Sequence, residues 1–77
     1  MKEDIIDRIG YCIVMENTGV RNLGEEKVAE YYSDIADHMM NGEEEKAVEL
    51  LRLLIEPEDG HIAKNIITIV LKHIQED

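Results

Sequence analysis

Four stretches of apolar residues recur at helical spacing along this chain of 77 residues, and Gly-centred breaks separate most of them. Because an α-helix turns by ~100° per residue, apolar residues three and four positions apart line one face that can pack against another helix. The stretches predict helices over residues of about 2–17, 25–40, 43–56 and 60–75. Short connections suit antiparallel neighbours. We therefore expect an all-α fold, a small bundle of four short antiparallel helices in a single domain spanning residues 1–77.

Local signals set the expected ends of these helices. Gly19 is a natural stop for the first helix, because Gly adopts the left-handed backbone that often ends a helix. Asn22 precedes Glu25 by three residues, which resembles a capping box with Asn in place of Ser or Thr. Pro57 is expected to stop the third helix, and Asp59 to cap the start of the fourth.

The apolar faces are wider than a monomer of this size needs. In the fourth helix they spread over ~200° of the helical projection. Tyr11, Val14 and Met15 lie off the main apolar stripe of the first helix, and Leu53 lies off that of the third. One interpretation is that the fourth helix is central and contacted on several sides. The other is that a surplus apolar patch forms a dimer or partner interface.

The charge is large and unevenly placed. The net charge is −10, and the segment from Glu25 to Asp59 holds twelve acidic residues against Lys27, Lys46 and Arg52, which gives −9. A field of this sign repels nucleic acids and anionic membranes and attracts basic surfaces. A helix-turn-helix interpretation of the last two helices is disfavoured, because the candidate recognition helix offers only Lys64 and Lys72 to contact phosphates and the helix before it is acidic. We expect no direct binding of nucleic acid or membrane.

No residue pattern indicates a catalytic, cofactor or metal site. His61 and His73 stand ~18 Å apart along one helix and cannot share a metal ion. His38 is placed by i, i−4 spacing to pair with Asp34, which is typical of a solvated helix end. Cys12 falls on an apolar face and is expected to be a core residue. We expect no enzyme, no cofactor, no bound metal and no substrate pocket of several hundred Å³.

In size, acidity and helix content the chain resembles acyl carrier proteins. Those proteins carry a phosphopantetheine on the Ser of an Asp-Ser-Leu motif at the start of their second helix. Here Ser33 follows Tyr32 instead of an Asp, and it falls in the middle of a predicted helix. The resemblance covers size and charge but not the motif, so an acyl-carrier-like protein is kept only as a remote alternative.

The leading hypothesis is a small acidic protein-binding module, an inhibitor or regulator that docks an acidic helical face on a basic surface of another protein. Aromatic and Met anchors inside a charged rim are typical of such interfaces. In a sharper version the acidic block imitates nucleic-acid phosphates and occupies a basic site on a DNA- or RNA-handling protein. The residues expected to form the face are Tyr31, Tyr32, Asp34, Asp37, Met40, Glu43, Glu44, Glu45 and Glu49.

The alternative hypothesis is a homodimeric structural or assembly protein with no catalytic role, held together by the surplus apolar faces. Cys12 is the only cysteine, which excludes an intrachain disulfide, and no charged-then-apolar secretory leader is evident. These observations predict a cytoplasmic protein.

Overall fold

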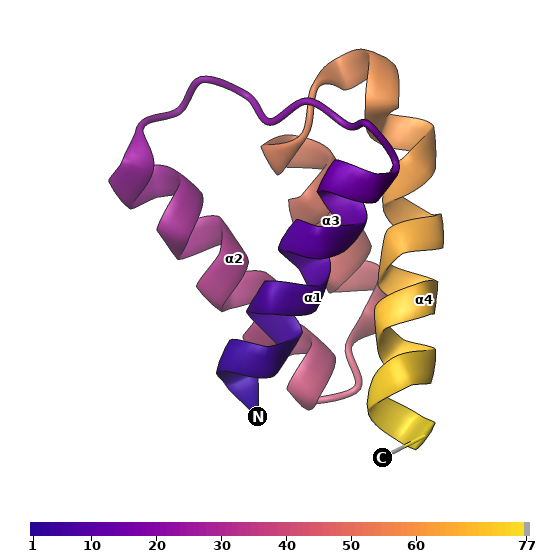
Figure 1. Ribbon diagram of the computed structural model, residues 1–77. Helices are drawn as coiled ribbons and strands as arrows, with labels where there is room; N and C mark the ends of the chain where they lie inside the picture. Colours follow the sequence, from indigo (N-terminus) through magenta and orange to yellow (C-terminus); the bar gives the residue numbers. More distant parts are fainter. Residues whose placement is uncertain (77) are drawn as a thin grey trace.

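The computed structural model describes residues 1–76 and confirms the all-α bundle. Four α-helices run in alternating directions, and a 3₁₀ helix leads into the last of them (Figure 1). The elements are α1 (Lys2–Met15), α2 (Glu25–Met40), α3 (Glu44–Leu54), η1 (Pro57–Ile62) and α4 (Ala63–Glu76). Each α-helix packs on the next, and α4 packs on α1. The helices therefore form a ring, with α2 and α3 on one side and α1 and α4 on the other.

The core is made of aliphatic side chains from all four helices. Ile9 of α1, Ile35 of α2, Leu51 of α3 and Ile66 of α4 are all fully buried. Helix α4 contacts α1, α3 and η1, so it is contacted on several sides as predicted, but it is not central, because it is one of four helices in a ring. That contact does not use its whole apolar surface, because Ile69 remains half exposed.

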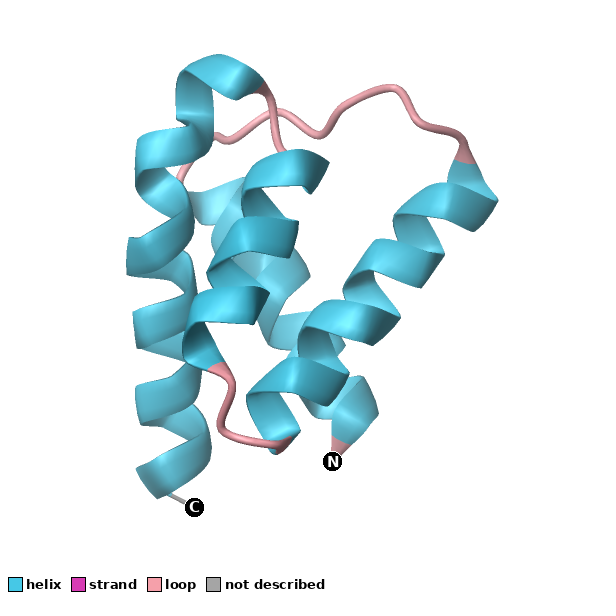
Figure 2. Cartoon of the chain, turned by 180° about the vertical axis from the view of Figure 1, so that it is seen from behind, coloured by secondary structure: helices cyan, strands magenta, loops and turns pink. Residues whose placement is uncertain are grey.

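Helix α2 packs along only part of its length. Its buried side chains, Ile35, Ala36 and Met39, all lie in its second half. Toward its N-terminus the helix diverges from α1 and α3, as both ribbon views show (Figures 1 and 2). The first turns are rich in Glu and Lys, which lack the apolar surface needed to pack inward. The far end of α2 is therefore more exposed than the rest of the bundle.

Helix α1 ends at Met15, two residues before the predicted end. Asn17 adopts a left-handed backbone with φ of 54°, so it takes the role predicted for Gly19. The amide of Thr18 donates to the carbonyl of Ile13 (2.9 Å), and the amide of Asn17 donates to that of Val14 (3.0 Å). This pair of hydrogen bonds is a Schellman motif, which satisfies the last carbonyls of the helix.

Helix α2 begins and ends where predicted, but the predicted cap is wrong. The residue before the helix is Gly24, with φ of 91°, and no side chain caps the first turn. Asn22 therefore forms no capping box. At the other end Gly42, with φ of 74°, donates to the carbonyl of Met39 (3.1 Å), and the turn into α3 starts there. The glycine signal at Asn41-Gly42 was correct, because glycine adopts a left-handed backbone without strain.

The start of α4 differs from the prediction. Helix α3 ends at Leu54, before Ile55 becomes extended, so Pro57 does not stop it. Pro57 instead opens η1, where its fixed φ and missing N–H suit a first helical position. Asp59 lies inside η1 and does not cap α4, which begins only at Ala63.

The linker of residues 16–24, between α1 and α2, is fastened to the end of α3 and to η1. The carbonyl of Gly19 accepts from the amide of Glu56 (2.9 Å), and the amide of Gly19 donates to Oδ2 of Asp59 (3.1 Å). Val20 forms an antiparallel bridge with Ile55. A Cβ at Gly19 would stand 2.9 Å from Cγ of Glu56, so any larger residue here would displace the Glu56 side chain. These contacts explain the extended backbone at the end of α3.

Arg21 of the linker caps the C-terminus of α3. Its Nε donates to the carbonyl of Ile55 (2.6 Å), and its Nη2 donates to that of Arg52 (3.0 Å). The amide of Arg21 also donates to the carbonyl of Leu54 (2.9 Å). A cation here stabilises the negative end of the helix dipole as well as its free carbonyls.

Replacing Thr18 by valine is expected to stabilise the fold. Thr18 is buried, and its Oγ1 has no hydrogen-bond partner among the described residues. Thr18→Val keeps the branched shape and removes the unpaired hydroxyl, so the free energy of unfolding should rise by about 1 kcal/mol. Urea unfolding measures this, with Thr68→Val at an exposed position of α4 as the matched control. Destabilisation by Thr18→Val would show that the hydroxyl makes a favourable interaction.

Candidate functional site

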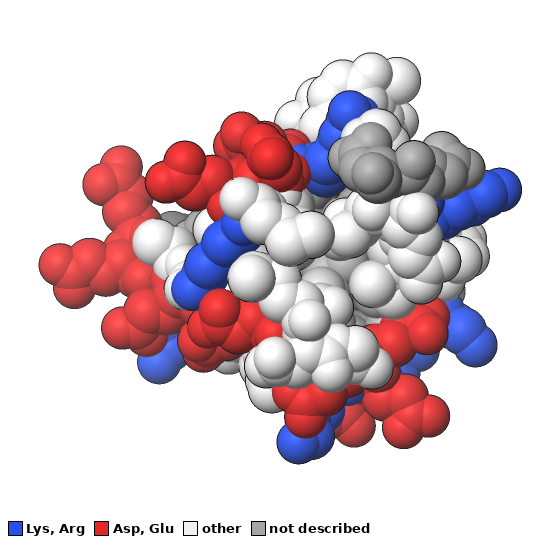
Figure 3. Space-filling view, turned by 90° about the horizontal axis from the view of Figure 1, so that it is seen from below, with Lys and Arg blue, Asp and Glu red and all other residues white. Residues whose placement is uncertain are grey.

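The predicted acidic residues lie on the side of the ring formed by α2 and α3. Asp34 and Asp37 of α2 are exposed, as are three residues of α3, namely Glu44, Glu45 and Glu49. Seen from below, acidic side chains dominate the side of the molecule that α2 occupies (Figures 1 and 3). Because α2 and α3 pack on each other, the tertiary structure brings the carboxylates of both helices onto neighbouring surfaces.

The predicted aromatic anchor residues are less exposed to solvent than most of the predicted acidic residues. Tyr31 and Tyr32 are half-buried and pack against the core. Burial raises the pKa of the Tyr32 phenol. Met40 is half exposed, whereas the neighbouring Met39 is buried in the core. Met40 is therefore the apolar side chain of this set that a partner can reach most fully.

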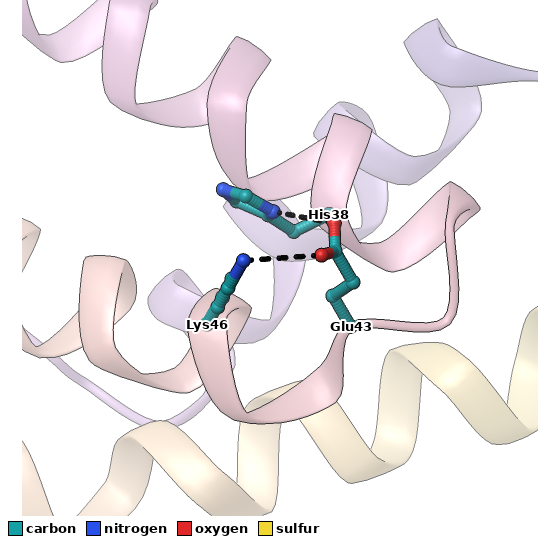
Figure 4. A network of polar contacts seen from close by, with 3 residues as sticks. All are labelled: His38, Glu43 and Lys46. Atoms are coloured by element: carbon teal, nitrogen blue, oxygen red, sulfur yellow. Dashed lines mark hydrogen bonds and ion pairs between the residues drawn. The ribbon is translucent and has the colours of Figure 1, made fainter.

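Glu43 lies in the turn between α2 and α3, and its carboxylate contacts one side chain of each helix. Its Oε1 lies 2.9 Å from Nδ1 of His38, and its Oε2 accepts from Nζ of Lys46 at 3.2 Å (Figure 4). These hydrogen bonds, first that of His38 and then that of Lys46, lower the pKa of the Glu43 carboxyl. His38 therefore pairs with Glu43, and the predicted pairing with Asp34 is wrong. The turn at Gly42 explains this, since it folds Glu43 back toward the last turn of α2.

Two of the predicted binding residues are thus engaged within the chain. Glu43 holds the α2–α3 turn, and Asp37 forms an ion pair of 2.9 Å with Lys2 of α1. Asp34, Glu44, Glu45 and Glu49 form no ion pair with any described residue.

Two exposed acids of α2 belong with these carboxylates and were missed from the sequence. Glu26 and Glu30 precede Asp34 at intervals of four residues, which places all three on one helix face. Neither forms an ion pair with a described residue. The i, i+4 spacing was the signal that could have found them. We define the acidic surface as six exposed carboxylates spaced along α2 and α3, none of which forms an ion pair with a described residue: Glu26, Glu30, Asp34, Glu44, Glu45 and Glu49.

The residues with nucleophilic or metal-binding chemistry do not converge. Among residues 1–76, no group of three or more His, Cys, Asp or Glu side chains is placed to hold a metal ion. Cys12 is buried in the core, where burial raises the pKa of its thiol. Ser33 lies in the middle of α2 and is half-buried. None of the helices in the described part of the chain is both long and apolar enough to cross a bilayer.

A hollow of about 700 Å³ lies where α1 meets the last turns of α4. The expectation that the chain has no substrate pocket of several hundred Å³ stays a prediction, because no ligand shows whether this hollow binds one. The hollow is open to solvent on one side and mixes apolar walls with charges of both signs. It is lined by Met1, Asp4, Ile5, Asp7, Arg8, Tyr11, His73 and Ile74.

The surplus apolar residues predicted from the sequence are exposed. Tyr11, Val14 and Met15 of α1 and Leu53 of α3 all have at least half of their surface open to solvent. The helical projection identified them correctly because each lies on the face opposite the buried stripe of its helix.

Comparison of the chain with protein-family models, with curated proteins and with solved structures finds no match in any of the three.

Proposed function

We propose that this protein is a protein-binding module that docks its acidic surface on a basic surface of another protein. The observation that carries the proposal is the set of six exposed carboxylates on two adjacent helices, within a segment that holds −9 of the net charge. Surface carboxylates without internal cations keep their full charge for an approaching partner. Met40, half exposed at the end of α2, offers an apolar contact within this charged region.

The partner class follows from the sign and density of the charge. Carboxylates spaced along two helices suit a surface of Lys and Arg side chains, such as those with which DNA- and RNA-handling proteins contact phosphates. Occupying such a site would make the protein an inhibitor or regulator of its partner. Duplex DNA should then compete with the protein for the partner.

Neutralising acids on α3 tests the proposal. A tagged protein captures its partner from native lysate, and the affinity of the purified partner is then measured calorimetrically. The variant Glu44→Gln, Glu45→Gln, Glu49→Gln should bind at least tenfold more weakly, because close charge pairs contribute about 1.5 kcal/mol or more each. Affinity for the unmodified protein should also fall steeply as salt rises.

A matched control removes the same charge from the opposite side of the ring. Glu3→Gln, Asp4→Asn, Asp7→Asn changes three exposed acids of α1 and shifts the net charge equally. It should leave binding within about twofold of the unmodified protein, since long-range effects of exposed charges are screened. The proposal fails if the α1 variant loses affinity and the α3 variant does not, or if affinity is insensitive to salt.

A further inference from the structure

Four of the exposed apolar side chains lie on α1 and α4, on the other side of the ring from the acidic surface. Tyr11, Val14 and Met15 are 58%, 75% and 65% exposed, and Ile69 of α4 is 49% exposed. Positions 11, 14 and 15 are spaced by three and four residues, so they share one face of α1. Leu53, by contrast, is an exposed leucine of α3 on the other side of the ring.

The packing of α1 against α4 forms a groove between the two helices, and the hollow lies in it. Tyr11 and His73 line the same hollow, and the two helices run in opposite directions (Figure 1). One turn beyond the hollow, α1 presents Met15 and α4 presents Ile69, each four residues from a lining residue. The apolar side chains therefore continue the hollow along the groove. We call this surface, made by Tyr11, Val14, Met15 and Ile69, the α1–α4 face.

The α1–α4 face belongs to the charge-balanced half of the molecule. Helices α1 and α4 together contain four basic and four acidic residues, so their net charge is zero. These are Lys2, Arg8, Lys64 and Lys72 against Glu3, Asp4, Asp7 and Glu76. Residues 25–62, which form the rest of the helical structure, carry −9. Two copies of this chain would repel strongly through the α2–α3 side, whereas the α1–α4 side lacks that barrier.

We propose that the α1–α4 face is a two-fold interface at which a second copy of this chain binds. A two-fold interface uses the same patch on both subunits, so it must tolerate its own charge, and a balanced patch does. Pairing on this side also places the two acidic surfaces at opposite ends of the dimer. The four apolar side chains expose on the order of 500 Å². With the rim of the hollow, this approaches the ~800 Å² per partner of a standard interface.

The test is the self-association constant from sedimentation equilibrium, measured as a function of salt. The protein should be dimeric at tens of micromolar, by analogy with interfaces of this size. Association should strengthen between about 0.05 M and about 0.5 M salt, because screening weakens the repulsion between two chains of net charge −10. Binding of a basic partner to the acidic surface has the opposite salt dependence. Failure of either proposal is therefore distinguishable from failure of the other.

Variants on both helices locate the interface. Val14→Glu with Met15→Glu should weaken dimerisation at least tenfold, and so should Ile69→Glu, because each buries an unpaired charge in the dimer. All three side chains are exposed, so the monomer should keep its circular dichroism spectrum. Leu53→Glu is the matched control and should leave the dimer unchanged. A monomer at 100 μM or above would overturn the proposal. So would a dimer that only Leu53→Glu disrupts.

Discussion

Replacing Leu54 by alanine is expected to lower the free energy of unfolding by about 3 kcal/mol. Leu54 is fully buried at the end of α3. Truncation removes buried methyl groups and leaves a cavity that neighbouring helices cannot fill completely. For 77 residues the total stability is of the order of 4–11 kcal/mol. The loss is therefore a large share of the whole, and urea unfolding with an unchanged m-value measures it.

The neighbouring residue supplies the control for this prediction. Leu53→Ala removes the same atoms from a side chain that is 50% exposed. It should change the free energy of unfolding by less than about 1 kcal/mol, because little apolar surface leaves the core. Similar losses for the two variants would mean that α3 presents a different face to the bundle than the one described.

Replacing Arg21 by alanine is expected to lower the free energy of unfolding by about 2 kcal/mol. The variant loses both guanidinium hydrogen bonds to the carbonyls of Ile55 and Arg52, which no other described side chain caps. The expected loss is smaller than the free energy of two fully buried charge-assisted hydrogen bonds, because Arg21 is only partly buried and solvent screens its charge. Urea unfolding gives the loss. Amide exchange at the end of α3 should accelerate by more than that at its centre.

One variant separates the geometry of Arg21 from its charge, and a second, at another position, serves as the control. Arg21→Lys keeps the cation but lacks the two-pronged donor, so it should recover only part of the lost stability. Arg8→Ala removes an exposed Arg that makes no hydrogen bond or ion pair with a described residue, and it should have little effect. If Arg21→Ala were as mild as Arg8→Ala, the cap would contribute nothing to stability.

Apolar spacing predicted the helices well because a helix is a local structure. The periodicity of residues such as Ile5 and Ile9, or Ile35 and Met39, located α1 and α2 and their buried faces. The same spacing separated Leu53 from the buried face of α3. Each of these features depends on residues within two turns, and hydrophobic burial acts on them in the same way in any bundle.

Helix ends were harder to predict because several residues competed for each role. Asn17 rather than Gly19 took the left-handed position after α1, since the turn closed two residues earlier. Asp59 was predicted as a cap but accepts a hydrogen bond from Gly19, 40 residues away in sequence. Hydrogen-bond partners so far apart in sequence meet only in the folded chain, so the residues around Asp59 do not predict them.

The sequence by itself determined four amphipathic helices and a charge concentrated between residues 25 and 59, because both are properties of neighbouring residues. Only the tertiary structure decided which helices share a side. By packing α1 on α4 it joined two helices that are separated by the 47 residues between Met15 and Ala63 into one charge-balanced half. The physical reason is that burying the shared core fixes the ring of helices, and the exposed charges and apolar side chains follow from it.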